Sequence, residues 1–305
     1  MCGILGMIGK PKPKAKKNLG KLFTHIFEEA ESRGKDASGF AAIVKEKKES
    51  KISFSKLPLK ASHFVEHDFY YRKLWSRDVR AVIAHTRFST LGNPKVNKNN
   101  HPFSAHQGNL WGLHNGKADV LKSKVSMKSL KTNCDSEYLV RIVEKHGIET
   151  GAKMILNSFA SVASMFLDRE TDQVHIFRNE QRPCWIVDMR ETAGVYLFCS
   201  TEEILMSAIQ KLNIDIDPDV FEVEPYTLYS FDIDLNIGRE DISVKSKYKV
   251  KAPDMRYKYT FETNFNSITT PRQDIYSDPF FDCEEEGDVA AKLRNGNLIG
   301  FRKTN

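Results

Sequence analysis

The sequence has few cysteines, and their spacing indicates neither a disulfide framework nor a zinc site. Five cysteines occur among 305 residues, at positions 2, 134, 184, 199 and 283. Their number is odd, and no two of them have the C-x-x-C spacing that is typical of structural zinc ligands. A metal site is therefore not expected, and a reducing cytoplasm is the expected compartment.

Long apolar runs are also missing. No uninterrupted run approaches the ~18 residues of a membrane-spanning helix. The N-terminus has no basic segment followed by a long apolar one, which excludes a typical secretion signal. We therefore expect a protein that is neither exported nor inserted into a membrane.

Charge of one sign is largely dispersed along the chain, apart from a proline-interrupted basic run at 10–17 that is expected to be a solvated loop. The 46 Lys and Arg residues exceed the 40 Asp and Glu residues by six, but the basic residues are dispersed rather than gathered beside aromatic ones. A nucleic-acid partner is therefore not expected. Apolar residues at 40% and charged residues at 28% are typical of a globular protein, and the length allows one large domain or two small ones.

The most informative stretch is the beginning of the chain. Cys2 is small enough for an aminopeptidase to remove Met1, which would leave Cys2 with a free α-amine beside its thiol. An α-amine titrates near pH ~8 and a free thiol near ~8.5, so a neutral amine can accept the thiol proton as the sulfur attacks. Cys2 is therefore the first candidate nucleophile. The alternative is a small buried residue at the start of an apolar strand.

Apolar periodicity predicts helices early in the chain and strands later. Spacings of three and four residues predict a helix over 19–30. Ser200-Thr201-Glu202-Glu203 predicts a capping box that opens a helix to about residue 212. Residues 45–80 are expected to be irregular. Apolar or β-rich runs predict strands at 2–8, 40–44, 81–85 and 109–116. From residue 161 on, short runs separated by turn residues predict antiparallel strands at 162–167, 173–178, 184–187, 195–199 and 226–233.

Two arginines lie where they could face a pocket. Arg33 and Asp36 flank Gly34 in a tight connection, which could bring both side chains toward a site, although a structural Arg–Asp pair that holds the loop is an equal alternative. Arg87 follows the strand 81–85 and has hydroxyl residues on both sides. A guanidinium in that position is well placed to hold a carboxylate through two hydrogen bonds.

Two further positions suit acyl-transfer chemistry. Asn115 and Gly116 end a strand, and a side-chain amide beside a backbone N–H without a Cβ is what an oxyanion hole requires. A hairpin turn is the alternative for Asn-Gly. Asp135 precedes an apolar helix, so it is expected to cap that helix or to hold a substrate ammonium group.

Beyond about residue 250 the apolar periodicity fades. Residues 253–305 combine aromatic residues with the acidic run 282–288. We expect a domain over residues 1–250 and a tail over 251–305. The tail would pack on the domain, dock a partner or be partly disordered.

Taken together, these residues resemble the class II glutamine amidotransferases, whose domains supply ammonia to glucosamine-6-phosphate synthase, amidophosphoribosyltransferase and similar enzymes. The similarity covers about residues 2–233. It rests on the order and rough spacing of Cys2, Arg33-Gly34-x-Asp36-x-x-Gly39, His85-Thr86-Arg87-x-x-Thr90-x-Gly92, His101-Pro102, His114-Asn115-Gly116 and Asp135-Ser136-Glu137.

The resemblance implies an α+β fold of four layers, αββα, in which two antiparallel sheets pack face to face between helices. It also implies roles for individual residues. Cys2 would be the nucleophile, with Asn115 and the Gly116 N–H as the oxyanion hole. Arg33, Gly34 and Asp36 would support the site, and the substrate would be bound by Arg87, Phe88, Thr90, His101 and Asp135.

Two departures from the family pattern concern the substrate loop. Phe88 stands where relatives often carry Trp or Tyr, and Leu91 stands where sugar-phosphate members carry His. Familiar members also continue into a synthase domain of several hundred residues. The closing of the site, or its coupling to an acceptor, is therefore expected to differ here.

The resulting hypothesis is a glutaminase module. Cys2 would attack the side-chain amide of L-glutamine, and water would hydrolyse the thioester to glutamate, without a metal or organic cofactor. Ammonia would pass to a separate synthase, and a homo-oligomer is left open. The alternatives are an amidohydrolase that acts on another amide and a regulatory subunit without turnover.

Overall fold

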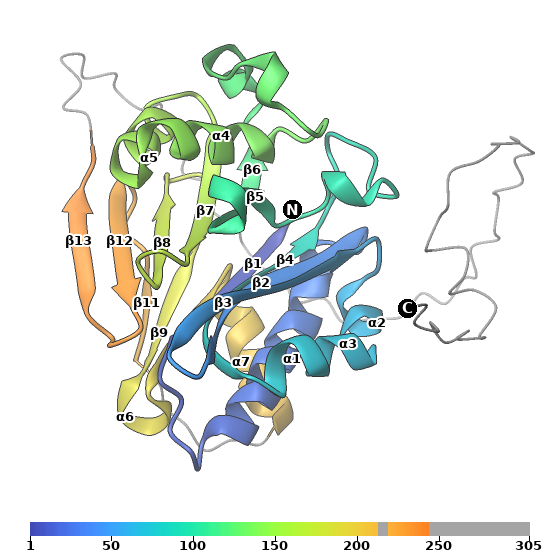
Figure 1. Cartoon of the computed structure of the whole chain (residues 1–305), viewed down its shortest axis with the longest axis vertical. Coiled ribbons are helices and arrows are strands. Elements are labelled where there is room, and N and C mark those ends of the chain that lie inside the picture. The colour runs from blue at the N-terminus through green and yellow to red at the C-terminus, as the bar shows by residue number, and fades with distance from the viewer. Residues whose placement is uncertain (213–218, 244–305) are drawn as a thin grey trace, which may run out of the picture. The chain divides into compact units, whose positions relative to one another are not determined.

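The computed structural model describes residues 1–212 and 219–243, which form two antiparallel sheets (Figure 1). The seven-stranded sheet has the order β11-β9-β10-β1-β4-β2-β3. Its strands are β1 (Gly3–Gly9), β2 (Ala37–Glu46), β3 (Glu49–Leu57), β4 (Asp78–Arg87), β9 (Trp185–Met189), β10 (Val195–Cys199) and β11 (Asp219–Glu222).

The six-stranded sheet has the order β13-β12-β8-β7-β6-β5. Every pairing in both sheets is antiparallel. The strands of this second sheet are β5 (Phe103–Ala105), β6 (Leu110–Lys117), β7 (Ser161–Asp168), β8 (Gln173–Arg178), β12 (Thr227–Asp232) and β13 (Ile237–Asp241).

Three apolar cores stack these elements into four layers. One core joins the first sheet to α1 (Lys16–Glu29) and α7 (Glu202–Leu212). A second core fills the space between the sheets. The third joins the second sheet to α4 (Ser136–His146) and α5 (Ile148–Leu156), as Figure 1 shows. The predicted α+β fold with αββα layers is confirmed.

Strand β1 lies at the centre of this arrangement because both of its faces are apolar. Leu5 and Met7 point into the helix-covered core, whereas Ile4 and Ile8 point into the core between the sheets. Alternate residues of a strand face opposite sides, so a run without polar residues fits a strand that is buried on both faces. The hydrophobic effect therefore fixes β1 in the middle of the fold, with the half-buried Cys2 directly before it.

Two local predictions from the sequence are wrong. Residues 45–80 are not irregular, since they contain β3 and two short helices, α2 (Ala61–Val65) and α3 (Asp68–Tyr70). β3 is an edge strand with charged and hydroxyl residues, which hides its periodicity. Ser200 does not cap α7, because its hydroxyl accepts the Ile4 N–H at 2.7 Å and donates to the Ile4 carbonyl oxygen at 3.2 Å.

The remaining short helical elements connect the strands. They are a π-helical turn η2 (Tyr71–Trp75), α6 (Arg190–Ala193), and the 3-10 helices η1 (Ala30–Arg33), η3 (Asn97–Asn99), η4 (His106–Gly108), η5 (Asp119–Lys124) and η6 (Met127–Ser129). None of the helices within residues 1–212 and 219–243 has both the length and the apolar character needed to cross a bilayer. The tail expected over 251–305 lies outside the described residues.

Candidate active site

The antiparallel pairing of β1 with β4 brings Cys2 to the end of the arginine-bearing strand. Gly3 pairs with Thr86, so the residue before β1, Cys2, comes next to Arg87, the last residue of β4. The Phe88 N–H points at the Cys2 sulfur across 3.3 Å. Thr86 fixes this end of β1, since its hydroxyl accepts the Gly3 N–H at 3.1 Å and donates to the Ala30 carbonyl oxygen at 2.7 Å. Thr86 was not among the predicted site residues.

Asn115 lies directly beside Cys2. Its Oδ1 accepts the Cys2 N–H at 3.1 Å, which orients the amide so that Nδ2 points elsewhere. The side chain is only 1% exposed, and Nδ2 has no hydrogen-bond partner within the described residues. A buried amide nitrogen without an acceptor is unusual, because its desolvation is not compensated. This donor is therefore available to a group that arrives with a substrate.

Gly116 is not part of a hairpin turn, because β6 continues through it and pairs with Val162 of β7. Its φ is +147°, and a Cβ built there would lie 1.7 Å from the Ser161 carbonyl oxygen. Only glycine fits this position. The turn interpretation of Asn115-Gly116 is thus wrong, and the two residues stand inside the sheet next to the thiol.

Arg87 is 2% exposed and holds the loop that follows it. Its Nη1 donates to Asn100 Oδ1 at 2.6 Å, and Nη2 donates to the carbonyl oxygens of Leu91 and Gly92 at 2.5 and 2.8 Å. A bidentate contact with a carboxylate uses Nη2 together with either Nη1 or Nε. Because Nη2 already serves two carbonyls, the predicted bidentate contact is not open in this arrangement.

Asp135 lies at the N-cap position of α4, but its carboxylate makes no capping hydrogen bond, so the capping interpretation is wrong. Oδ2 instead accepts the Ala118 N–H at 2.7 Å. Cys134 lies between the two charges, with its sulfur 4.0 Å from Arg87 Nη2 and 3.8 Å from Asp135 Oδ1. A buried cation and a buried anion therefore stand on either side of one small residue.

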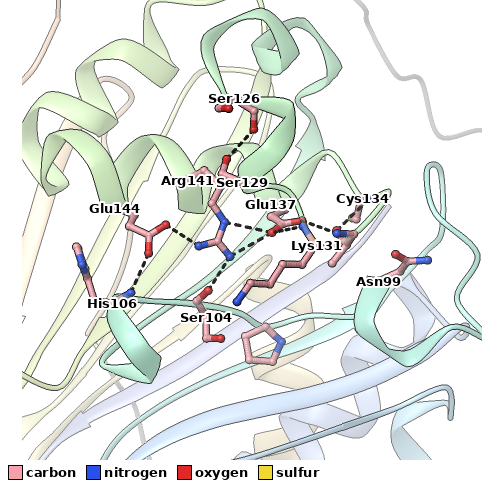
Figure 2. A network of polar contacts seen from close by, with 12 residues as sticks. Asn99, Ser104, His106, Ser126, Ser129, Lys131, Cys134, Glu137, Arg141 and Glu144 are labelled. Carbon is pink, nitrogen blue, oxygen red and sulfur yellow. Dashed lines mark hydrogen bonds and ion pairs between the residues drawn. The ribbon is translucent and has the colours of Figure 1, made fainter.

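The turn that carries Cys134 and Asp135 is held by a buried carboxylate (Figure 2). Glu137, 1% exposed, accepts the backbone N–H groups of Lys131 and Thr132 at 3.1 and 2.8 Å. Arg141 bridges this carboxylate to Glu144 and to the Ser104 carbonyl oxygen. Charge-assisted hydrogen bonds of this kind fix backbone positions firmly. α4 thus positions Asp135 through its first turn.

The predicted supporting residues do hold the site, although Arg33 and Asp36 do not pair with each other. Arg33 Nε donates to the Cys2 carbonyl oxygen at 2.9 Å. Asp36 Oδ2 accepts the Ser89 N–H at 2.6 Å, which ties the loop after β4 to the loop before β2. A Cβ on Gly34 would lie 2.4 Å from the Arg87 carbonyl carbon, so glycine permits the close approach of these two loops.

Three histidines near the site, His85, His101 and His114, are buried, and burial lowers the pKa of each. His85 and His101 stack with ring centroids 3.8 Å apart. Burial lowers the pKa of His85 to about 3 and holds the pKa of His101 well below its usual range. Neither ring nitrogen of His101 has a partner in the described part of the chain. His114 is fixed between Ser136 Oγ at 2.9 Å and the Ser161 carbonyl oxygen at 3.1 Å.

Phe88 and Thr90, both predicted to contact substrate, are exposed, and Phe88 is 53% exposed. Burial raises the pKa of the Cys2 thiol, and the Asp135 charge adds to this. The Phe88 N–H, the positive N-terminus and Arg87 act in the opposite direction. One end of β1, β4 and β6 therefore gathers four functional groups, namely the Cys2 sulfur, the Asn115 amide, the Arg87 guanidinium and the Asp135 carboxylate.

No family model matches the chain, but comparisons with known proteins find relatives and similar structures. The chain is 32% identical over 197 residues to a glutamine–fructose-6-phosphate aminotransferase [isomerizing] of Bacteroides thetaiotaomicron, covering 60% of the chain and 30% of that protein. It is 24% identical over 263 residues to the enzyme of the same name from Sulfurisphaera tokodaii, covering 82% of the chain and 41% of that protein. The chain thus spans less than half the length of these relatives.

Solved structures show the same fold. The chain resembles the allosteric regulatory enzyme of purine biosynthesis with a TM-score of 0.58 at 19% identity, covering 79% of this chain and 49% of that one. The chain is thus similar in sequence to these aminotransferases and has the fold of this solved structure. The domain also resembles glutamine phosphoribosylpyrophosphate amidotransferase from B. subtilis, with a TM-score of 0.55 at 18% identity and the same coverage.

The sequence did not point to every residue that builds this candidate site. Asn100 contributes the oxygen that accepts a hydrogen bond from Arg87. Cys134 contacts Arg87 and Asp135 with its sulfur. Ser161 contributes the carbonyl oxygen that excludes a side chain at position 116. These roles depend on contacts between distant segments, so no local pattern announces them. Thr86 alone had a signal, as a hydroxyl beside Arg87 at the end of a buried strand.

Proposed function

We propose that the amidotransferase domain, residues 1–250 after removal of Met1, hydrolyses the side-chain amide of L-glutamine to glutamate and ammonia. The observation that carries this proposal is the buried Asn115 amide, which holds the Cys2 nitrogen through Oδ1 and keeps Nδ2 without a partner among the described residues. Such a donor beside a nucleophile suits the oxyanion of a tetrahedral intermediate.

The reaction follows from the groups that surround the thiol. The neutral α-amine of Cys2 accepts the thiol proton, and the sulfur attacks the amide carbon of glutamine. Asn115 Nδ2 and the Gly116 N–H stabilise the oxyanion. The carbon–nitrogen bond then breaks, and the departing nitrogen takes the proton from the α-ammonium group. Water attacks the thioester, which releases glutamate and regenerates the thiol, so glutamine and water become glutamate and ammonia.

Charge complementarity supports an amino acid as the substrate. The Arg87 guanidinium and the Asp135 carboxylate stand on either side of Cys134 and match the α-carboxylate and α-ammonium groups of glutamine. His101, Phe88 and Thr90 complete the proposed substrate site. Since Arg87 Nη2 holds the loop carbonyls of Leu91 and Gly92, the carboxylate is bound through Nη1 unless that loop moves.

An electrophilic glutamine analogue tests the proposal directly. Diazo-oxo-norleucine should inactivate the processed chain and leave one adduct, which peptide mass spectrometry should locate on Cys2. L-glutamine should protect against this labelling, because both compounds compete for the same charges. Labelling of another cysteine, or no protection by glutamine, would contradict the assignment.

We further propose that the ammonia is used by an amidating synthase that residues 1–250 do not include, in the cytoplasm. The relatives from Bacteroides and Sulfurisphaera are named as aminotransferases, and the chain matches 30% and 41% of their lengths. The mixed aromatic and acidic sequence of 251–305 supports this segment as the docking element.

Removal of residues 251–305 is expected to leave glutamine hydrolysis unchanged and to abolish co-purification with the synthase. Hydrolysis serves as the internal control, because a folded domain keeps it. Unchanged co-purification after the deletion would refute the docking role of this segment.

A further inference from the structure

Two guanidinium groups converge on the residue that processing removes. Arg182 Nη1 lies 3.3 Å from the Met1 sulfur, and Arg33 Nη2 lies 3.9 Å from the same atom. Arg33 ends η1, and Arg182 belongs to the connection between β8 and β9. Since both touch one sulfur atom, the two cations are close neighbours in space although they are far apart in the sequence.

No acid pairs with these two cations. None of the ion pairs within residues 1–212 and 219–243 includes Arg33 or Arg182. The buried Nε of Arg182 has no hydrogen-bond partner in the same described residues. Two like charges that form no ion pair within the described residues oppose folding, so their placement here suggests a role that needs positive potential.

Arg33 contacts the residue whose nitrogen becomes the α-amine, and Arg182 contacts the side chain of the residue attached to that nitrogen. Arg33 Nε donates to the carbonyl oxygen of Cys2 itself. The charge of Arg182 also acts on His114, whose neighbour Asn115 accepts the Cys2 N–H. When Met1 leaves, nothing of the removed residue separates Arg182 from the new amine.

We propose that Arg182 is a positioning residue for glutamine hydrolysis: with Arg33, it surrounds the Met1 position with positive charge and so keeps the freed α-amine of Cys2 neutral. This inference rests on the proposed function. A neutral amine can accept the thiol proton, whereas an ammonium group cannot. The same positive potential favours the thiolate over the buried thiol.

Other charged groups also contribute to the electrostatic potential around Cys2. Arg87 adds positive charge from the end of β4, and Asp135 opposes it from the start of α4. His114 of β6 is neutral because burial lowers its pKa, so it contributes little. Among the described residues, the titratable and charged groups that act on the Cys2 thiol, His114 or the two arginines are the Cys2 thiol, Arg33, Arg87, His114, Asp135, Arg182 and, acting on Arg33 from α7 and β10, Glu203 and Cys199.

The test is the pH dependence of Arg182→Gln in the full chain, with Met1 removal verified by intact mass. Positive neighbours lower the pKa of an amine, so loss of Arg182 should raise it. The acid limb of kcat/KM for glutamine hydrolysis should therefore move to higher pH by roughly 0.5–1 unit. Arg182→Lys keeps the charge and should leave the limb in place.

Arg190→Gln is the matched control, because it removes the same charge from α6 at the opposite end of β1. An unmoved acid limb in Arg182→Gln, or an equal shift in Arg190→Gln, would overturn the proposal. Nitrogen-15 titration of the Cys2 α-amine gives the same answer without turnover. If the wild-type chain does not hydrolyse glutamine, the proposed function fails, while this titration still decides the role of Arg182.

Discussion

Replacement of Cys2 by alanine is expected to abolish glutamine hydrolysis, with a loss of at least ~10³-fold in kcat. The Cys2 sulfur is the group that forms the thioester in the proposed reaction, and the Asn115 amide and the Phe88 N–H are both arranged around Cys2. Removing the nucleophile leaves the binding charges of the site in place. The measurement is glutamate release from the purified chain, followed over the full range of glutamine concentrations.

Processing and folding are the controls for this variant. Alanine is also a small second residue, so Met1 should still be removed, which intact mass will show. Cys184→Ala removes a different thiol, one buried between the sheets, and should retain hydrolysis. Activity that survives in Cys2→Ala would contradict an N-terminal nucleophile.

Replacement of Asn115 by alanine is expected to lower kcat by about 10²–10³-fold, equivalent to roughly 3–4 kcal/mol of transition-state stabilisation. The reason is the loss of the buried Nδ2 donor, which has no other partner among the described residues. The effect should fall mainly on kcat, because the oxyanion exists in the transition state and not in bound glutamine. Steady-state kinetics of the two proteins will measure it.

Asn115→Asp separates the two halves of the amide. It keeps an oxygen that can accept the Cys2 N–H, but it lacks the N–H₂ donors and carries a negative charge. An oxyanion role for Nδ2 requires this variant to be as slow as Asn115→Ala. If Asn115→Asp retained most of the activity, the amide would serve only to position the Cys2 nitrogen.

Several elements could be predicted from the sequence because their signal is local. The three- and four-residue spacing of apolar side chains in α1 and the apolar run of β1 each follow from a single segment that buries a face. β3 was missed because an edge strand carries polar residues that obscure its alternation. The role of Ser200 was misread because its partner, Ile4, is 196 residues away.

The candidate site likewise combines residues that could be predicted from the sequence with contacts that could not. Cys2, Asn115 and Arg87 were identified from residue type and order, and the fold brings them together. Their detailed contacts were not foreseeable. Arg87 holds loop carbonyls where two open hydrogen-bond donors were expected, and Asp135 accepts the Ala118 N–H where a helix cap was expected. Such contacts are decided by whichever partner lies closest after packing.

What the sequence by itself determined is which segments bury an apolar face and which reactive side chains are present, since apolar periodicity fixes the buried faces and residue type fixes what each side chain can do. The layering followed from the resemblance to a known family. Only the tertiary structure decided that Asn115 keeps a buried nitrogen without a partner in the described chain and that Arg33 and Arg182 meet at Met1. These properties arise between segments far apart in the chain, where distance and solvent exclusion set the energy of each polar group.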